Sequence, residues 1–245
     1  MGKIIAVVSG KGGTGKTSFT ANVGLALAER GMRVLCIDCD ITMRNLDLAL
    51  GLSDCSVMDF CDVVTGRCPL ADAVSAHRKY PSLHMLTAPR REDAQQVTPQ
   101  QLQKLGGEIR EVYDFCLIDA PAGLGLGFQL ATACADNVVV VTTTDNSALR
   151  DAQRTVMELS RFRKGCVHLA VGRVQKKMLR QLHTTIDDAI DTAGLPLIGV
   201  IPEDGEVSTA LNRGIPLRDF NFYAARAYEN IARRLCGEKV PLMKI

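Results

Sequence analysis

Residues 10 to 17 read GKGGTGKT and combine the residue types that bind phosphate. Their spacing fits the pattern G-x-x-x-x-G-K-[ST], in which glycines let successive backbone N–H groups turn toward phosphate oxygens. In such a loop Lys16 reaches the outer phosphates and the Thr17 hydroxyl binds Mg²⁺. The segment therefore predicts a nucleotide-phosphate site. Its residues are Gly10, Lys11, Gly12, Gly13, Thr14, Gly15, Lys16, Thr17 and Ser18.

Three aspartates stand where apolar runs of the chain end. Asp38 and Asp40 close one run, and Asp119 closes another. Ligands of doubly wound sheets bind outside the carboxyl ends of the strands, so the three carboxylates are expected to converge on the phosphates. There they could hold Mg²⁺ or position an attacking water. A single aspartate at a strand end is usually a turn residue, but three beside a phosphate loop favour a functional site.

The elements that must carry these residues alternate between apolar runs and helical segments. This alternation is typical of a parallel sheet covered on both faces. We predict a three-layer α/β fold with a mostly parallel, doubly wound sheet flanked by helices. The predicted strands are 3–9, 33–39, 83–88, 114–120, 137–143, 167–174 and 197–201. The predicted helices between them are 16–30, 99–112, 147–161 and 180–193.

Length and composition indicate one domain, which we place at residues 1–238 with a short tail at 239–245. A last helix is predicted from an apolar stripe at Phe220, Ala224, Tyr228, Ile231 and Leu235, and we expect it to dock on the sheet rather than on a membrane. Aromatic residues make up 4% of the chain and Trp is missing, which argues against an aromatic platform for stacking bases. The net charge of +2 neither demands nor excludes an acidic partner.

Nine cysteines, mostly within predicted strands and helices, predict a reducing cytoplasm. Cys36 and Cys39 form a C-x-x-C pair, but they lie on one predicted strand and should face opposite sides of it. We expect buried thiols there rather than a metal or redox site. The sequence has no signal peptide and no apolar run approaching 20 residues, which also favours a cytoplasmic location.

These residues resemble the MinD/ParA family of deviant Walker-type P-loop ATPases, whose mark is an extra lysine early in the loop, here Lys11. The similarity runs from Met1 to about residue 238 and is strongest to the MinD group of septum-site-determining ATPases. The stretches that carry it are IDCDITMRNLDLALGL at 37–52, IDAPAGLG at 118–125, LRDAQR at 149–154 and IGVIPEDGEVSTALNRGIP at 198–216.

The resemblance implies a bound ATP (or ADP) with Mg²⁺, and an ATP-dependent homodimer in which two subunits enclose two nucleotides. It implies that Lys11 reaches the nucleotide of the partner subunit, that Lys16 grips phosphates and that Asp40 positions the attacking water. By the same resemblance, the metal site comprises Thr17, Asp38 and Asp119. A second lysine would stabilise transition-state charge much as an arginine finger does.

Contacts to the base and to partners are also implied by the resemblance. The base-end residues are Arg173, Gln175, Pro202 and Glu203, with Gln175 standing where the family usually has Asn. Asp151, in the first turn of a predicted helix, is expected on a partner surface. The loop after Asp119 carries Gly123, Gly125 and Gly127, which suggests a mobile switch or close packing against the dimer partner.

The function that the resemblance implies is a spatial switch in division-site placement, with division-site regulatory proteins as partners. Members of the MinD group typically end in a basic amphipathic segment that this sequence does not show, so binding to the inner face of the cell membrane stays undecided. Two alternatives are a ParA-like or flagellum-placing ATPase and an ATP-locked scaffold with little turnover. Binding of DNA is not favoured, although basic residues that could contact it occur at positions 161, 163, 164, 173, 176, 177 and 180.

Overall fold

The computed structural model describes residues 1–53, 58–182, 185–219 and 222–243. In this part of the chain, eight strands form one sheet in the order β3-β4-β2-β5-β1-β6-β7-β8. Neighbouring strands are parallel except β3, which runs antiparallel to β4. The strands are β1 Lys3–Ser9, β2 Val34–Asp38, β3 Ser75–Ala76, β4 Leu83–Leu86, β5 Phe115–Ala122, β6 Asn137–Thr142, β7 Val167–Val174 and β8 Leu197–Pro202. The predicted fold with a mostly parallel sheet is confirmed.

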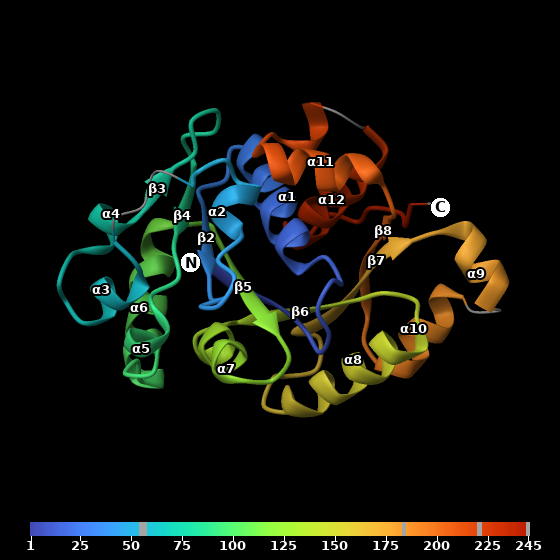
Figure 1. Cartoon of the computed structure of the whole chain (residues 1–245), viewed down its shortest axis with the longest axis horizontal. Coiled ribbons are helices and arrows are strands. Elements are labelled where there is room, and N and C mark those ends of the chain that lie inside the picture. The colour runs from blue at the N-terminus through green and yellow to red at the C-terminus, as the bar shows by residue number, and fades with distance from the viewer. Residues whose placement is uncertain (54–57, 183–184, 220–221, 244–245) are drawn as a thin grey trace.

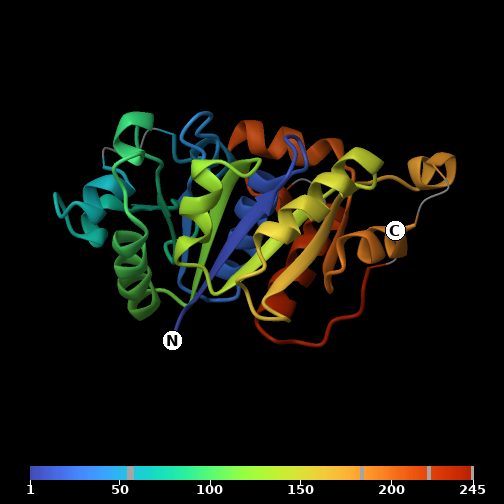
Figure 2. The same ribbon diagram turned by 90° about the horizontal axis from the view of Figure 1, so that it is seen from below.

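Helices cover both faces of this sheet (Figures 1 and 2). One face carries α1 Lys16–Glu29, α2 Leu46–Ala49, α11 Gly205–Arg213 and α12 Phe222–Leu235. The other carries α6 Pro99–Val112, α7 Leu126–Ala133, α8 Asn146–Glu158 and α10 Ile186–Ala193. The remaining short helices are α3 Phe60–Val64, α4 Leu70–Ala73, α5 Arg91–Ala94, α9 Lys176–Leu182 and the 3-10 turn η1 Leu217–Asp219.

The central strand β1 explains why two cores form. Residues 4 to 9 of β1 are all buried, as expected of a strand with neighbours on both sides and helices on both faces. Because side chains alternate along a strand, Ile4 packs into the core under α6, α7 and α8, and Ile5 packs into the core under α1 and α12. The strand is thereby fixed, and the loop that follows it has a rigid base.

The sequence-based boundaries agree with the observed strands to within two residues, but one helix prediction is wrong. The helix predicted over residues 180–193 is two helices, α9 ending at Leu182 and α10 beginning at Ile186. Thr185 begins α10 because its hydroxyl accepts a hydrogen bond from the Asp188 N–H in a capping box. The strand β3 and the helices α2, α3, α4, α5, α7 and α11 were not predicted, and most of these have fewer than nine residues.

The last helix and the cysteine pair follow the predictions. Ala224, Tyr228 and Ile231 of α12 are buried against the sheet, whereas Phe220 lies outside the described residues. Cys36 and Cys39 are both buried, and they belong to the cores on opposite faces of the sheet. Among the described residues, no helix is both long enough and apolar enough to cross a bilayer.

Candidate nucleotide-binding site

The loop between β1 and α1 curls at the carboxyl end of the central strand. Gly13 and Gly15 have φ angles of 75° and 95°, in the left-handed region that glycine adopts without strain. Gly10 is needed for a different reason, because a Cβ there would lie 2.5 Å from the backbone oxygen of Asp151 on α8. The loop thus presents backbone N–H groups at the N-terminus of α1, where the helix dipole attracts anions.

Lys16 begins α1 and is almost enclosed, with 8% of its surface exposed. Its Nζ donates a hydrogen bond of 2.8 Å to the Ser9 hydroxyl, which in turn donates one of 2.7 Å to the Lys11 carbonyl. Burial lowers the pKa of Lys16, and the nearby carboxylates of Asp119 and Asp40 oppose that shift. Ser9 was not predicted as a site residue, although it is the last residue of the predicted first strand.

Two of the predicted metal ligands meet at the ends of neighbouring strands. Asp38 of β2 and Asp119 of β5 are register partners, and both are buried. The Thr17 hydroxyl donates a hydrogen bond of 2.6 Å to Asp119, and the Thr20 hydroxyl donates one of 3.3 Å to its other oxygen. Asp38 accepts from the backbone N–H groups of Asp40 and Leu46. The structure therefore brings Thr17, Asp38 and Asp119 together as predicted.

The electrostatics of this pair suit a bound cation. Burial first, and then the charge of Asp119, raises the pKa of Asp38 to about 7. Burial also raises the pKa of Asp119 to about 6, despite the hydrogen bond from Thr17 and the charge of Lys16. Two adjacent carboxylates and a hydroxyl are oxygen ligands of the kind Mg²⁺ prefers, since that ion keeps several waters and uses few protein ligands.

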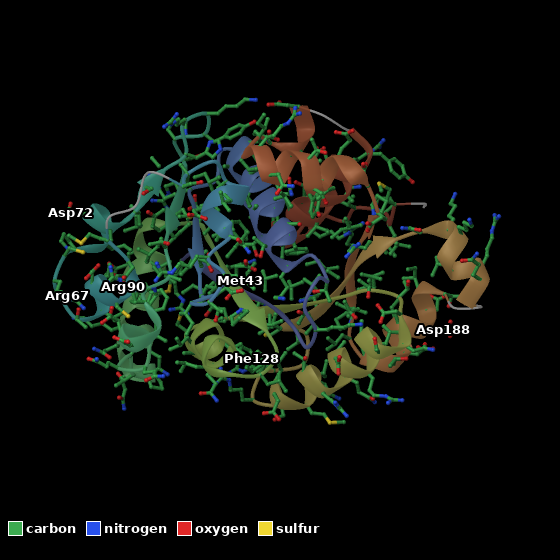
Figure 3. The ribbon with its side chains drawn as sticks, viewed as in Figure 1. Met43, Arg67, Asp72, Arg90, Phe128 and Asp188 are labelled. Carbon is green, nitrogen blue, oxygen red and sulfur yellow. The ribbon has the colours of Figure 1, made fainter. Side chains whose placement is uncertain are left out.

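A cavity of about 530 Å³ opens beside these residues. The phosphate loop forms one end, and half-buried Asp40 lies in its wall next to Met43. The Asp40 carboxylate accepts hydrogen bonds of 3.1 Å from the Thr42 N–H and 3.0 Å from the Met43 N–H. Figure 3 places Met43 near the middle of the molecule, between the side that carries Arg67, Asp72 and Arg90 and the side that carries Asp188.

The far end of this cavity is formed by residues of β8, α11 and α12. Its lining there comprises the apolar Ile201, Pro202 and Val207, the ring of Tyr228, and the polar Glu203, Asp204 and Ser208. A second cavity of about 360 Å³ lies next to it and is lined by Lys11, Thr143, Asp145 and Gln175. Of the predicted base-end residues, Arg173 and Glu203 line both cavities, Pro202 lines the first and Gln175 the second.

Lys11, the other lysine of the phosphate loop, has different surroundings from Lys16. Lys11 lies on the surface, and its Nζ donates hydrogen bonds of 2.6 Å to Ser147 and 3.3 Å to Asp145. Although burial opposes the shift, hydrogen bonds from Ser147, Thr143, the Ala148 N–H and Lys11 hold the pKa of Asp145 well below its usual value. Neither Asp145 nor Ser147 was predicted as a site residue. The signal available was an Asp two positions before the helix predicted from residue 147, and in the structure this Asp is the N-cap of α8.

Two further predictions can be placed in the structure. Asp151 is half-buried on α8, 3.7 Å from Arg154, and its backbone abuts Gly10; it lines neither cavity. In the loop after Asp119, Gly123 has a φ of 87°, and a Cβ on Gly127 would lie 2.3 Å from Pro121 and 2.8 Å from the Cys39 carbonyl. Close packing within the chain therefore accounts for Gly127.

A glycine loop between a central strand and its helix, a buried lysine and two strand-end aspartates define a P-loop nucleotide hydrolase. Comparison with known proteins agrees. A family model described as AAA domain matches residues 2–168. The septum site-determining protein MinD of Synechocystis sp. is 38% identical over 247 residues, covering 99% of this chain and 92% of that protein.

Solved structures give the same result. The MinC:MinD cell division protein complex of Aquifex aeolicus contains a chain 37% identical to this one, with a TM-score of 0.90 and coverage of 99% and 98% of the two chains. MinD of Pyrococcus horikoshii OT3, solved in complex with Mg-ADP, is 33% identical with a TM-score of 0.83 and coverage of 96% of each chain. The chain belongs to the MinD family of P-loop ATPases.

Proposed function

We propose that this chain binds ATP and Mg²⁺ in the 530 Å³ cavity, forms a homodimer when ATP is bound, and hydrolyses ATP as a spatial switch in division-site placement. The observation that carries the proposal is the convergence of Lys16, Thr17, Asp38 and Asp119, of which Lys16 and Thr17 line that cavity. Membership of the MinD family supplies the biological role, and the relative from Pyrococcus horikoshii OT3 has been solved with Mg-ADP.

The residues at the phosphate end fit a nucleotide with its metal. The Thr14 hydroxyl is buried and has no hydrogen-bond partner among the described residues, as expected of a group that binds a phosphate oxygen of the ligand. Thr17, Asp38 and Asp119 would hold Mg²⁺, which when bound supplies positive charge to the phosphate oxygens. Lys16 would leave Ser9 to contact the outer phosphates, and Asp40 would orient the attacking water by accepting its proton in a hydrogen bond.

The position of Lys11 supports a shared site in the dimer. Its ammonium is half exposed and is tied to Asp145 and Ser147 at the start of α8, away from Asp38 and Asp119. An exposed pair of this kind contributes about 0.2–1 kcal/mol, so a partner's nucleotide can compete for the lysine. We infer that Lys11 acts on the nucleotide of the partner subunit, which would make hydrolysis depend on dimerisation.

We infer that a division regulator is the partner, because the Aquifex aeolicus relative has been solved with MinC. Asp151 on α8 is the residue we propose for that surface, since α8 also holds Ser147, which would be released when Lys11 moves. Coupling of this kind would link the partner surface to the nucleotide state.

A DNA-binding role is less well supported. The basic residues at 161, 163 and 164 precede β7, and those at 176, 177 and 180 follow it. A strand of eight residues spans about 26 Å, so the two groups lie at opposite ends of the sheet. Arg173, the remaining basic residue of this set, is paired with Glu203 beside the two cavities. Binding to the inner face of the cell membrane stays undecided. Sedimentation with lipid vesicles in the presence of ATP or ADP would test it.

The test uses the purified chain with ATP and Mg²⁺. We expect hydrolysis and a doubling of the mass by light scattering with ATP but not with ADP. An Asp40→Ala variant should still dimerise and should stall turnover; if it kept full function in cells, the scaffold alternative would be favoured. In bacteria lacking their own MinD, the wild-type chain should restore mid-cell division. Failure to bind nucleotide at all would overturn the proposal.

A further inference from the structure

Arg173 has a backbone conformation that few residues with a side chain adopt. Its φ is 54°, and within the described ranges only Arg44 among other non-glycine residues is also positive. A left-handed conformation costs such a residue about 1–2 kcal/mol and persists where its surroundings impose it. The pairing of β7 with β8 is irregular between Val171 and Val174, around this residue. The chain therefore accepts strain to place the Arg173 side chain.

The Arg173 side chain forms a bridge between Glu203 and the phosphate loop. The Arg173 Nε and Nη2 donate to the two carboxylate oxygens of Glu203 at 2.9 and 3.2 Å. The third nitrogen, Nη1, donates to the Gly13 carbonyl of the phosphate loop at 3.0 Å. Glu203 is itself anchored, because its N–H donates to the Val174 carbonyl. One guanidinium thus occupies both oxygens of Glu203 and joins it to the loop.

This bridge lies at the end of the 530 Å³ cavity where we expect the nucleotide base to bind. Lys16 marks the phosphate end of the 530 Å³ cavity, so the base belongs at the apolar end with Pro202, Val207 and Tyr228. Two carboxylates border that end. Asp204 is engaged as the N-cap of α11, accepting from the Glu206 N–H. Glu203 is the other, and its state decides which base the pocket accepts.

The two purines place different demands on a carboxylate. Guanine offers two adjacent donors, its N1–H and its 2-amino group, which a free carboxylate can accept together. Adenine has an acceptor at N1 and no 2-amino group, so a free carboxylate would repel it at that edge. A carboxylate paired with arginine on both oxygens keeps one lone pair on each oxygen, but its charge is largely neutralised and its orientation is fixed by the guanidinium, so it accepts from guanine more weakly and repels adenine less.

We propose that Arg173 is a positioning residue that sets base specificity: by holding both oxygens of Glu203 and neutralising their charge it weakens that carboxylate as an acceptor for guanine, so the site favours adenine. The proposal rests on the proposed function, since it assumes ATP in the 530 Å³ cavity. It assigns to Arg173 no contact with the base and no part in hydrolysis.

The experiment compares the affinities of ribose-labelled fluorescent ATP and GTP, with Mg²⁺, for the full chain and its variants. We expect the wild type to prefer ATP. Arg173→Met frees Glu203, and the ATP-to-GTP affinity ratio should fall about tenfold to hundredfold, the value of one hydrogen bond to a charged group. Adding Glu203→Gln to that variant should restore most of the ratio. Arg173→Lys should give an intermediate ratio.

Arg33→Met is the matched control. Arg33 is 57% exposed at its side chain, as is Arg173, and it makes the same two-bond pair with a carboxylate, Asp114, far from the cavity. The control should leave the ratio unchanged, and thermal unfolding of every variant checks that it folds. If Arg173→Met weakens ATP and GTP equally, or if the wild type does not discriminate, the inference is overturned. Absence of ATP binding in the wild type would instead contradict the proposed function.

Discussion

The two lysines of the phosphate loop lie five positions apart and have opposite surroundings. Lys16 is buried, bonded to Ser9 and close to Asp119 and Asp40. Lys11 is half exposed at its side chain and is held by Asp145 and Ser147 of the next layer. The groups around Lys16 come from strands β1, β2 and β5 at the centre of the sheet, whereas those around Lys11 belong to the surface at the start of α8.

This difference indicates what each region can do in a single chain. The region around Lys16 is nearly complete in one chain, because Lys16, Thr17 and the two strand-end aspartates find polar partners within the fold and the Thr14 hydroxyl is left for the ligand. The region around Lys11 makes contacts that cost little to break, since exposed ion pairs are worth less than about 1 kcal/mol. We therefore expect the first region to govern nucleotide binding and the second to govern the step that needs a second subunit.

Lys16→Met should have the largest effect. The variant keeps the apolar stem but removes the charge that faces the phosphates, and we expect ATP affinity to fall about 100-fold or more with no measurable hydrolysis. Titration calorimetry with ATP and Mg²⁺ is the measurement. Lys3→Met, at the exposed start of β1, is the control and should bind as the wild type does. Normal ATP affinity in the Lys16 variant would remove Lys16 from the site.

Lys11→Ala should separate binding from turnover. We expect the ATP dissociation constant to change less than about threefold, because the lysine is held away from its own chain's metal ligands. Turnover should fall about 1,000-fold, the low end of the effect of an arginine finger. Calorimetry and a phosphate-release assay give the two numbers. If affinity falls as far as it does for Lys16→Met, the two regions are not functionally distinct.

Much of the Lys16 region could be predicted from the sequence, and little of the Lys11 region. The phosphate loop is contiguous, and Asp38 and Asp119 end apolar runs whose parallel pairing brings those ends together. The contacts of Lys11, by contrast, join residues more than 130 positions apart through side-chain rotamers. Hydrophobic periodicity carries no information on such contacts.

The helices and strands likewise differ in how far the sequence predicts them. The long strands are continuous apolar runs and helices such as α6 and α8 have a helical period, so their bounds were predicted closely, whereas α2 and α4 have four residues each and no period to detect. The bridge from Arg173 to Glu203 and Gly13 was not predictable either, because it depends on a left-handed residue inside an apparent strand. The family resemblance named both residues of the ion pair without indicating that they bind each other.

The pH dependence of stability should also differ between the Lys16 region and the Lys11 region, with a smaller effect than the two lysine substitutions have. Since the pKa of Asp38 is raised to about 7, the folded protein retains a proton that the unfolded chain has released. The contribution of Asp38 to the stability of the nucleotide-free protein should therefore fall as the pH rises from about 4 to about 8, with roughly 1 kcal/mol of that fall between pH 6.5 and 8. Asp145 has a lowered pKa, so its contribution changes only in acid.

Denaturant unfolding across that range measures the effect. The histidines His77, His84 and His168 have lowered pKa values, so their contribution to stability rises with pH near 6.5 and opposes that of Asp38. The contribution of Asp38 is therefore the difference between the wild-type profile and that of Asp38→Asn, which keeps the same histidines. Excess Mg²⁺ should reverse the slope of this difference, because the metal binds the deprotonated carboxylates. A wild-type profile parallel to that of Asp38→Asn would mean that Asp38 is not held protonated by burial.

The smallest expected effect concerns Ser147, the hydroxyl that holds Lys11 at 2.6 Å. Ser147→Ala removes this bond and leaves the N-cap of α8 in place, because Asp145 still accepts from the Ala148 N–H. Loss of an exposed bond of less than about 1 kcal/mol should leave Lys11 held by Asp145 alone and tighten ATP-dependent dimerisation by up to about fivefold. Light scattering at several protein concentrations measures it, with Ser160→Ala as the control on an exposed serine beyond the same helix. Weaker dimerisation would mean that Ser147 serves the dimer directly rather than holding Lys11 in the single chain.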